Sequence, residues 1–338
     1  IGTPYALARD ANDNIFVTGS FGYIGSTLRR NLAKLAPNGS VLAGWAPGET
    51  CIGSGRIAVG GNGDLYVPGC TRFVSVSAPG TSYYRTDIVR FNGSTGALTP
   101  GFSAHVAVPN TSTVPFIAEL EVTADAIYAG GSFLLANGSD RTNLVKLGLD
   151  GTVVPTWNPA PNATVSALLV SGSDVFVGGN FTQIGGQALP FLARLDATGT
   201  PSMIFGPVPN GSVYWLEQDA SGLYAAGVFS NIGGLARSSL AKVNPASGAA
   251  DPGFQALTDS SVSSVLANGA SLFVGGFFTQ VNAEERIGLA RLNAMNGANL
   301  SSPLSTRQPS ITALARQPDG ATLIGGGFVR PGSTMRNL

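Results

Sequence analysis

The chain has 338 residues, of which 43% are hydrophobic and 11% are charged, and its formal net charge is zero. A single hydrophobic core rarely grows to this size, so we expect either several domains or a repeat architecture. The neutral balance argues against nucleic acid or an anionic membrane as a partner. No apolar run reaches the roughly 18 to 20 residues that a membrane-spanning helix needs, so we expect no membrane insertion.

The composition favours short strands joined by tight turns. The chain contains 46 glycines and 21 prolines, and Val, Phe, Thr and Tyr occur in short runs. Residues that favour helices are scarce, and β-branched and aromatic residues fit strands better than helices. We therefore predict an all-β protein with almost no helix.

Seven copies of one unit follow each other along the chain. Each copy contains a glycine two residues before a Phe position, and these anchor glycines are Gly19, Gly69, Gly131, Gly179, Gly227, Gly276 and Gly326. Their spacing is 48 to 50 residues, except for 62 residues after Gly69. A period of this size is typical of a four-stranded propeller blade, and the extra residues of the second unit predict longer loops on one face.

The clearest unit indicates four strands. VSALLV (165–170) is followed by VFVGG (175–179) and FLARL (191–195), and the preceding unit ends in the aromatic and proline segment TWNPAP (156–161). The alternation in LARL predicts a half-buried strand, with Leu inward and Ala and Arg on the other face. The glycine pair predicts a close backbone approach at a strand end or bulge.

These observations predict a single seven-bladed β-propeller over residues 1–338, with four-stranded antiparallel blades. The expected blades span residues 1–50, 51–112, 113–160, 161–208, 209–257, 258–307 and 308–338. The first and seventh units align so that the seventh lacks its outer strand within the printed sequence. A strand from another segment or a neighbouring molecule would then complete that blade.

The repeat pattern resembles the bacterial delta-60 type β-propeller repeat. The resemblance lies in V-G-G-x-F-T-x-(I/V)-G-G, followed by L-A-R-L-(D/N) and an aromatic-Pro segment, and it covers essentially the whole chain. The unit at Gly69 departs from it, with Pro-Gly-Cys-Thr in place of Gly-Gly-x-Phe. The resemblance implies a propeller of secreted or cell-surface bacterial proteins and carries no set of catalytic residues.

Few residues of the chain suggest catalysis or metal binding. The single histidine, His105, lies in the second unit's insertion and is expected to be a solvated loop residue. Structural zinc takes about four Cys or His ligands, and the chain lacks them. The acidic run 10–14 matches the hairpin turns of sister units, so we interpret it as a turn and not as a calcium loop. We therefore assign no catalytic residue, no metal and no cofactor.

Two cysteines, Cys51 and Cys70, are close enough in sequence to form a disulfide. A bridge that closes a loop of this length stabilises by about 3 kcal/mol in the chain-entropy model. The alternative is a pair of small buried thiols. The disulfide is favoured if the protein is secreted.

Charged residues recur ten positions before the anchor glycine, where the first strand of a unit ends. They are Arg9, Glu121, Glu217 and Arg316, while the other units carry Val59, Leu169 and Leu266 there. The four charges could gather at one mouth of a central channel and form a polysaccharide hydrolase or lyase site. The alternative is a set of solvated strand ends with compensating charges.

Two aromatic features depart from the repeat. Trp215 stands where sister units carry Ala167 or Leu7, and Tyr83, Tyr84 and Arg85 fall in the second unit's predicted extra loop. Exposed aromatic residues beside arginine are typical of carbohydrate stacking and protein hot spots. The alternative is that Trp215 fills a gap in the core and that the tyrosines cover the blade.

The sequence therefore favours a non-catalytic module, secreted or at the cell surface, that binds a protein or a glycan or serves in adhesion or matrix assembly. Two alternatives remain open. One is a polysaccharide-active hydrolase or lyase that uses Glu121 and Glu217. The other is a structural subunit of a surface filament or layer, in which the last blade accepts a strand from a neighbour. The fold cannot decide among these, because propellers have unrelated functions.

Overall fold

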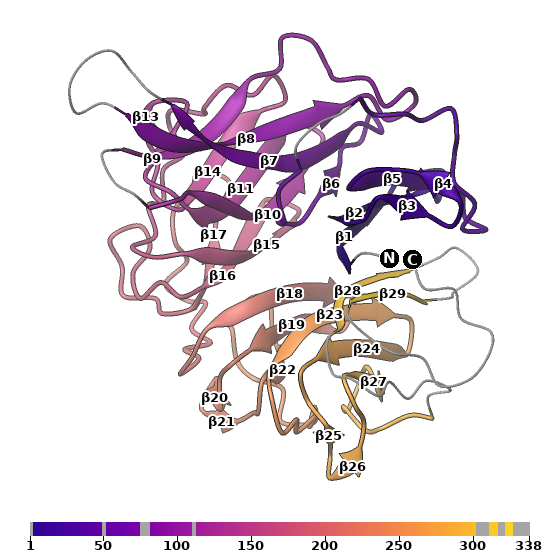
Figure 1. Ribbon diagram of the computed structural model, residues 1–338. Coiled ribbons are helices and arrows are strands. Elements are labelled where there is room, and N and C mark those ends of the chain that lie inside the picture. Colours follow the sequence, from indigo (N-terminus) through magenta and orange to yellow (C-terminus); the bar gives the residue numbers. More distant parts are fainter. Residues whose placement is uncertain are drawn as a thin grey trace.

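The computed structural model describes residues 3–48, 52–74, 82–109, 113–301, 311–316 and 322–326. Within these ranges all regular structure is β, and no helix is long and apolar enough to cross a membrane. The strands are arranged in small antiparallel sheets around a common centre (Figure 1).

Each unit begins with an antiparallel pair of strands, and within the described residues six of the units add a third strand. The first strands are β1 (Thr3–Arg9), β6 (Ala58–Val59), β10 (Phe116–Val122), β15 (Val165–Ser171), β18 (Val213–Asp219), β23 (Val262–Asn268) and β28 (Ile311–Arg316). The second strands are β2 (Ile15–Ser20), β7 (Leu65–Val74), β11 (Ala126–Ser132), β16 (Asp174–Gly179), β19 (Gly222–Gly227), β24 (Ser271–Gly276) and β29 (Thr322–Gly326). The third strands are β5 (Leu32–Leu35), β8 (Tyr83–Phe91), β14 (Leu144–Gly148), β17 (Leu192–Leu195), β22 (Leu240–Val243) and β27 (Leu289–Asn293).

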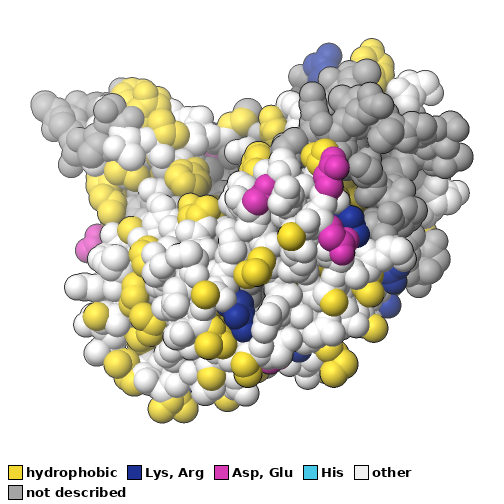
Figure 2. All heavy atoms as spheres, turned by 90° about the horizontal axis from the view of Figure 1, so that it is seen from below, with side chains coloured by type: hydrophobic (Ala, Val, Ile, Leu, Met, Phe, Trp, Pro, Cys, Tyr) yellow, Lys and Arg dark blue, Asp and Glu magenta, His cyan; other side chains and the backbone are white. Residues whose placement is uncertain are grey.

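The first strands form a closed ring. Each of them contacts the first strand of the next unit, and β28 contacts β1, so the two ends of the described chain meet (Figure 1). This closure confirms the propeller, and the arrangement is compatible with seven blades. Figure 2 shows one face of the molecule, on which few side chains are charged and hydrophobic ones are scattered, as the composition leads one to expect.

Short two-residue strands form hairpins outside the main sheets of four units. These hairpins pair β3 (Tyr23–Ile24) with β4 (Thr27–Leu28), β12 (Leu135–Ala136) with β13 (Ser139–Asp140), β20 (Asn231–Ile232) with β21 (Leu235–Ala236), and β25 (Gln280–Val281) with β26 (Glu284–Glu285). They coincide with the F-T-x-I-G-G part of the repeat.

The second unit differs from the others because its sheet has six strands. β9 (Ala104–Pro109) is a full fourth strand, and it pairs with β12 of the next unit, so the order is β13-β12-β9-β8-β7-β6. The prediction of a loop at Tyr83, Tyr84 and Arg85 is wrong, since these residues lie on β8 and pair with both β7 and β9. His105 is likewise a strand residue of β9, half-buried, and not a solvated loop residue. Alternating β-branched and aromatic residues explain why the insertion lengthens the strands.

Elsewhere the fourth segment of a unit is not a regular strand. In the first, third, fourth and fifth units it makes an isolated bridge to the third strand, as Val153 does with Leu147, and then carries a buried aromatic side chain. Prolines in these segments remove donors that a ladder would need. Each aromatic ring packs edge-on against an aromatic residue of the second strand, as Phe254 does against Tyr224 at 5.7 Å between centroids.

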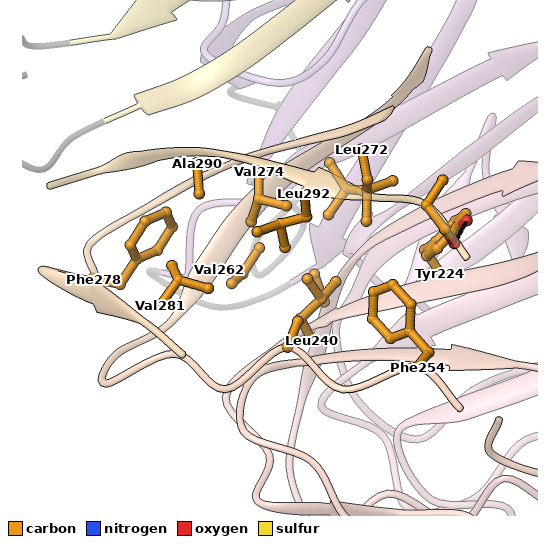
Figure 3. Close-up of a cluster of buried hydrophobic side chains, with 14 residues drawn as sticks. Tyr224, Leu240, Phe254, Val262, Leu272, Val274, Phe278, Val281, Ala290 and Leu292 are labelled. Carbon is orange, nitrogen blue, oxygen red and sulfur yellow. Dashed lines mark hydrogen bonds between the residues drawn. The ribbon is translucent and has the colours of Figure 1, made fainter. Parts of the chain in front are cut away.

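These aromatic side chains also fill the space between neighbouring units. Figure 3 shows Phe254 and Tyr224 beside Leu240 of one unit and Leu272 of the next, all in one buried cluster. Apolar burial of this kind is the main stabilising term of folding, at about 25 cal/mol per Å². The core is therefore distributed around the ring between successive sheets.

The LARL-type strands have their Leu and Ala residues buried on both faces, so the prediction of a half-buried strand is wrong. Of the L-A-R-L residues in β17 and β27, only the arginine is itself half-buried. All four residues of β5, Leu32–Leu35, are buried, because sheets cover it on either side. Lys34 forms an ion pair with Asp10 there, at 2.8 Å, and its Nζ lies 4.7 Å from the centre of the Phe16 ring. A buried charge is tolerated only with such partners.

The glycine pairs mark a close approach at a bulge, as predicted. In the fourth unit the register shifts between Val165 and Ala167 opposite the pair. A Cβ on Gly179 would overlap the carbonyl oxygen of Thr164, and one on Gly178 would lie 2.8 Å from a methyl group of Val213 in the next unit. The first glycine thus makes room for the neighbouring unit and the second for its own first strand.

The acidic run of the first unit forms a turn. One carboxylate oxygen of Asp10 accepts hydrogen bonds from the backbone N–H groups of Asn12 and Asn14, each at 2.9 Å. This geometry agrees with the turn interpretation. Two other predictions fall outside the described residues: the Cys51–Cys70 disulfide, because of Cys51, and the completion of the last blade beyond residue 326.

Candidate functional site: the central channel

A cavity of about 250 Å³ lies at the centre of the ring. First strands or their flanking residues from six of the seven units line it. Its walls are largely aliphatic, with Leu168, Leu169 and Leu314 among them, and its charged residues are Arg56, Glu119, Glu121 and Glu217.

Strand register explains which residues reach the cavity. Glu119 pairs with Gly130 and Glu121 with Tyr128, and in the fifth unit Trp215 and Glu217 hold the same two positions opposite Ala226 and Tyr224. Since side chains alternate along a strand, each pair of positions shares one face. In the second unit Ala58 pairs with Tyr66, so Arg56, two residues earlier, corresponds to Glu119 and Trp215.

Arg56 connects three units across the cavity. Its guanidinium forms a short ion pair with Glu119 and donates a hydrogen bond of 3.1 Å to the carbonyl oxygen of Tyr214. It also lies over the indole ring of Trp215, 3.5 Å from the ring centre. Such cation–π contacts are strongest with Trp and when water is excluded. One side chain of the second unit is therefore held by the third and the fifth.

The carboxyl groups of the cavity hold protons more tightly than ordinary glutamates. Burial, reinforced by the nearby Glu119 and Glu217 charges, raises the pKa of Glu121 to about 8. Burial also raises the pKa of Glu217 to about 7, although its carboxylate accepts a 3.1 Å hydrogen bond from the backbone N–H of Ala267. Burial raises the pKa of Glu119 to about 7 against the opposing effect of Arg56. A desolvated carboxylate with too few donors favours its neutral form.

The structure brings together two of the four predicted channel charges. Glu121 and Glu217 line the cavity, whereas Arg9 and Arg316 are exposed and do not. Arg9 pairs with Ile15 in the ladder and its side chain forms a 2.8 Å ion pair with Asp13. Arg316 pairs with Thr322 at the corresponding position of the last unit. Both arginines therefore fit the interpretation as solvated strand ends better, and Arg9 has its compensating charge in Asp13.

Turn length explains why the count grouped Arg9 and Arg316 with the two glutamates. Five residues separate Arg9 from Ile15, Val59 from Leu65 and Arg316 from Thr322, whereas four separate Val122 from Ile127. A count of ten from the anchor glycine therefore stops one residue short in the first, second and seventh units. A shift of one residue moves a side chain to the opposite face of the sheet. Arg56 was missed for another reason: like Glu119, it lies two residues before the strand position that the count was meant to find.

The predicted aromatic residues occupy two separate places. Trp215 lines the cavity and packs against a core cluster, which combines the two interpretations of this residue. Tyr84 lies on β8 with its ring 5.2 Å from that of Phe73 on β7. Arg85, on the same strand, pairs with Asp87 at 2.8 Å. Trp215 and the Tyr83–Arg85 segment therefore cannot form one binding surface.

Chemically, the cavity is a small acidic site whose lining residues include several aliphatic ones. Three carboxyl groups face one guanidinium, and Glu119 is the one that Arg56 pairs with. Among the described residues, no three His, Cys, Asp or Glu side chains are arranged to hold a metal ion. The arrangement can therefore accept a cation or supply a proton, and it resembles no metal centre.

Fold and repeats together define a β-propeller repeat protein. A family described as "Domain of unknown function (DUF5122) beta-propeller" matches residues 11–41, 126–153, 174–201, 222–254 and 271–298. The matched segments centre on the second and third strands of five units. No curated protein matches the sequence.

Several solved structures, one of them named as a propeller, are similar to the chain along most of its length. The WD40 beta propeller domain of Doa1 has a TM-score of 0.59 at 12% identity, covering 96% of this chain and 90% of that one. Virginiamycin B lyase from Staphylococcus aureus has a TM-score of 0.56 at 13% identity, covering 93% and 88%. The computationally designed Ika8 protein has a TM-score of 0.54 at 11% identity, covering 96% and 93%. At these identities the similarity concerns the fold alone.

Proposed function

We propose that this protein is a non-catalytic binding module that accepts a cationic group in its central channel. The observation that carries the proposal is the charge imbalance of the cavity. Arg56 pairs with Glu119, so Glu121 and Glu217 are left without a counter-charge of their own. Among the described residues, the hydrogen-bond partner of the Glu217 carboxylate is the backbone N–H of Ala267. An ammonium or guanidinium group would supply the donors and the charge that these carboxylates lack.

The size of the cavity favours a small group over a polymer. Its volume of about 250 Å³ lies below the roughly 300 to 1,000 Å³ of typical small-molecule sites. Aliphatic walls would contact the methylene groups of a lysine or arginine side chain while its charged end meets the carboxylates. The occupant that fits best is the basic side chain of a partner protein.

The protonation of the carboxyl groups gives the proposal a distinctive pH dependence. Because the pKa of Glu121 is about 8 and that of Glu217 about 7, both groups are largely neutral below pH 6 and ionised above pH 9. A cation binds the ionised form, so its binding releases protons. Affinity should therefore rise with pH over this range.

Calorimetric titration with N-acetyl-lysine amide at pH 6 and pH 9 tests the proposal. We expect tighter binding at pH 9, and at least tenfold weaker binding to the Glu217→Gln variant. The matched probe is N-acetyl-norleucine amide, which has a similar aliphatic chain without the ammonium group. The matched control variant is Glu285→Gln, which changes an exposed carboxylate on β26. Equal binding of the two amides, or no binding of either, would contradict a cation site.

Catalysis is a second candidate, supported by the raised pKa values of Glu121 and Glu217. A neutral carboxylic acid beside an ionised one is the arrangement that glycoside hydrolysis needs. The virginiamycin B lyase structure shows that an enzyme can have a similar fold, but the identity is too low to carry its activity to this chain. Turnover on a panel of glycans that is lost in Glu121→Gln or Glu217→Gln would favour this candidate.

We also propose that the protein acts outside the cell or at its surface, where the partner is a protein or a glycan. Low charge and abundant Gly, Ser, Thr and Asn support this location. A disulfide between Cys51 and Cys70 would agree with it, because such bridges persist in oxidising compartments. Thiol alkylation of the native protein should then label neither cysteine before reduction and both after it. Labelling without reduction would contradict an oxidising location.

A further inference from the structure

A second cavity, of about 320 Å³, lies on the enlarged sheet of the second unit. Arg72 of β7, together with Arg85 and Asp87 of β8, lines one part of it. The segment that leads into β9 contributes Phe102 and Ser103. The volume is within the usual range of small-molecule sites.

The arginines of this cavity are incompletely neutralised. Arg72 and Arg85 are direct cross-strand partners, so two like charges lie on the same face of adjacent strands. Both guanidinium groups pair with one carboxylate, Asp87, at 2.7 Å and 2.8 Å, each on a different oxygen. Like charges directly opposite each other are destabilising. A single carboxylate leaves one positive charge in excess.

Other groups in the cavity do not remove this excess. Arg90 also lines the cavity, and it pairs with Asp64 at 2.6 Å, so its charge is compensated separately. His105 is the cross-strand partner of Asp87, and its Nδ1 is buried without a hydrogen-bond partner among the described residues. Burial and the positive charge of Arg85 lower the pKa of His105, with Asp87 acting in the opposite direction and Arg72 in the same one. A neutral imidazole adds no positive charge.

The remaining lining suits the rest of a small ligand. Thr99 and Ser103 provide hydroxyl groups, and Phe102 provides an aromatic ring that is itself held edge-on by Tyr66, at 5.8 Å between centroids. Hydroxyl groups can donate to and accept from the ring hydroxyls of a sugar. An aromatic face packs against its apolar C–H face. Arginine, in turn, binds carboxylate and other oxyanions with a geometry that lysine cannot match.

We infer that this cavity is a binding site for an acidic sugar, whose carboxylate or sulfate ester group is bound by Arg72 and Arg85. The site is separate from the central channel and opposite to it in charge. The bound anion would compensate the excess charge of the arginine pair, and Asp87 would hold the two guanidinium groups side by side in the empty state. The longer strands of the second unit would then serve to build a ligand-binding site.

The single histidine of the chain provides a direct readout. Titration of the whole protein with glucuronate should shift the only imidazole resonance in the NMR spectrum and raise the pKa of His105, because an anion beside Arg72 and Arg85 favours the protonated ring. Glucose matches the sugar ring without the charge and should produce no shift. Glucose 6-sulfate tests the sulfate ester in place of the carboxylate, and binding of either acidic sugar supports the inference.

Variants and a simple anion complete the test. Arg72→Gln should weaken binding at least tenfold while leaving the fold intact, since the Arg72 side chain is 58% exposed. Arg316→Gln, which changes an exposed arginine of β28, should bind as the parent does. If inorganic sulfate binds as tightly as glucuronate, the site recognises an oxyanion alone and the sugar assignment fails. If neither acidic sugar shifts the imidazole resonance, or if Arg72→Gln binds normally, the site itself is disproved.

Discussion

At the scale of single residues, the central channel combines a buried ion pair with carboxyl groups that resist ionisation. A glutamate whose pKa is about 8 in the folded state and about 4.5 when unfolded costs stability wherever it must ionise. Folding then binds a proton between these two pH values, so stability falls as the pH rises through that interval. Glu121 is the strongest case.

Replacing Glu121 with Gln should therefore stabilise the protein at high pH. The parent loses up to roughly 1.4 kcal/mol per pH unit from this group as the pH rises, whereas Gln has no charge to bury. We expect Glu121→Gln to unfold a few degrees higher than the parent at pH 8.5 and at about the same temperature at pH 4.5. Thermal melts at both pH values measure the difference, with Glu285→Gln as the exposed control. An equal effect at both pH values would show that burial of the charge is not the cause.

Glycine 179 is required by the space around it and not by its backbone angle. A Cβ there would overlap the carbonyl oxygen of Thr164, which belongs to the backbone and cannot turn away. Overpacking of this kind costs about 1–3 kcal/mol, so Gly179→Ala should lower the free energy of unfolding by about that amount. Gly206→Ala is the control, because nothing lies within 4 Å of a Cβ at Gly206. Chemical denaturation of both variants would decide, and equal stabilities would remove the steric explanation.

At the scale of elements, the enlarged second sheet shows how a repeat departs from its pattern. Residues that were expected to form a loop continue β7 and β8, and a register shift between Pro68 and Thr71 bends the longer hairpin. Thr71 and Thr86 are cross-strand partners, and their hydroxyl oxygens lie 2.6 Å apart. Phe73 and Tyr84 follow as an aromatic pair near the end of the hairpin.

Tyr84 should contribute to the stability of this hairpin. Cross-strand aromatic pairs contribute about 0.2–1 kcal/mol, so Tyr84→Ala should lower the free energy of unfolding by about that amount. A double-mutant cycle with Phe73→Ala measures the coupling of the two rings. If the coupling between the two rings is near zero, and Tyr84→Ala loses binding of a partner with unchanged stability, Tyr84 is a binding residue instead.

The strand order was predictable from sequence because seven glycine anchors repeat the same local geometry. The irregular form of the fourth segment was not predictable. Prolines limit its pairing to one isolated bridge, and its aromatic residue, such as Trp157, is buried between neighbouring sheets. Glu121 and Glu217 were found because their units share the four-residue turn. Arg56 was missed because it lies two residues before the strand position of Glu121 and Glu217, which was the position sought. No local signal in the sequence reveals that its guanidinium lies over Trp215, which is 159 positions away.

At the scale of the whole molecule, Arg56 links units that face each other across the central channel. It connects the second, third and fifth units through Glu119, Trp215 and the carbonyl oxygen of Tyr214. Glu119 is only 4% exposed, so loss of Arg56 would leave this carboxyl group buried without its ion-pair partner. Removing one partner of a buried ion pair is far more costly than replacing both.

Arg56→Met should lower the free energy of unfolding by about 3–5 kcal/mol, although protonation of Glu119 at low pH should reduce the loss. The double variant Arg56→Met with Glu119→Gln should recover much of the stability, since Gln leaves no charge to bury. Arg286→Met, which breaks a more exposed ion pair with Glu284, should cost less than about 1 kcal/mol. Urea unfolding of the four proteins measures these effects. An Arg56→Met variant as stable as the parent would show that the contacts of Arg56 across the channel do not contribute to the free energy of unfolding.

The enlarged second unit also makes one position around the ring different from all the others. A disc of near-identical repeats has almost the same appearance after each step of rotation about its axis, so a partner approaching along that axis would find several equivalent orientations. In the described part of the chain, the six-stranded sheet is built on the second unit, which also carries the Arg72–Arg85 cavity and the arginine that crosses the channel. All three features mark the same unit, so they distinguish the same orientation of the ring. A partner that contacts both the channel and the second unit is therefore held at one angle, and the disc can orient what it binds as well as retain it.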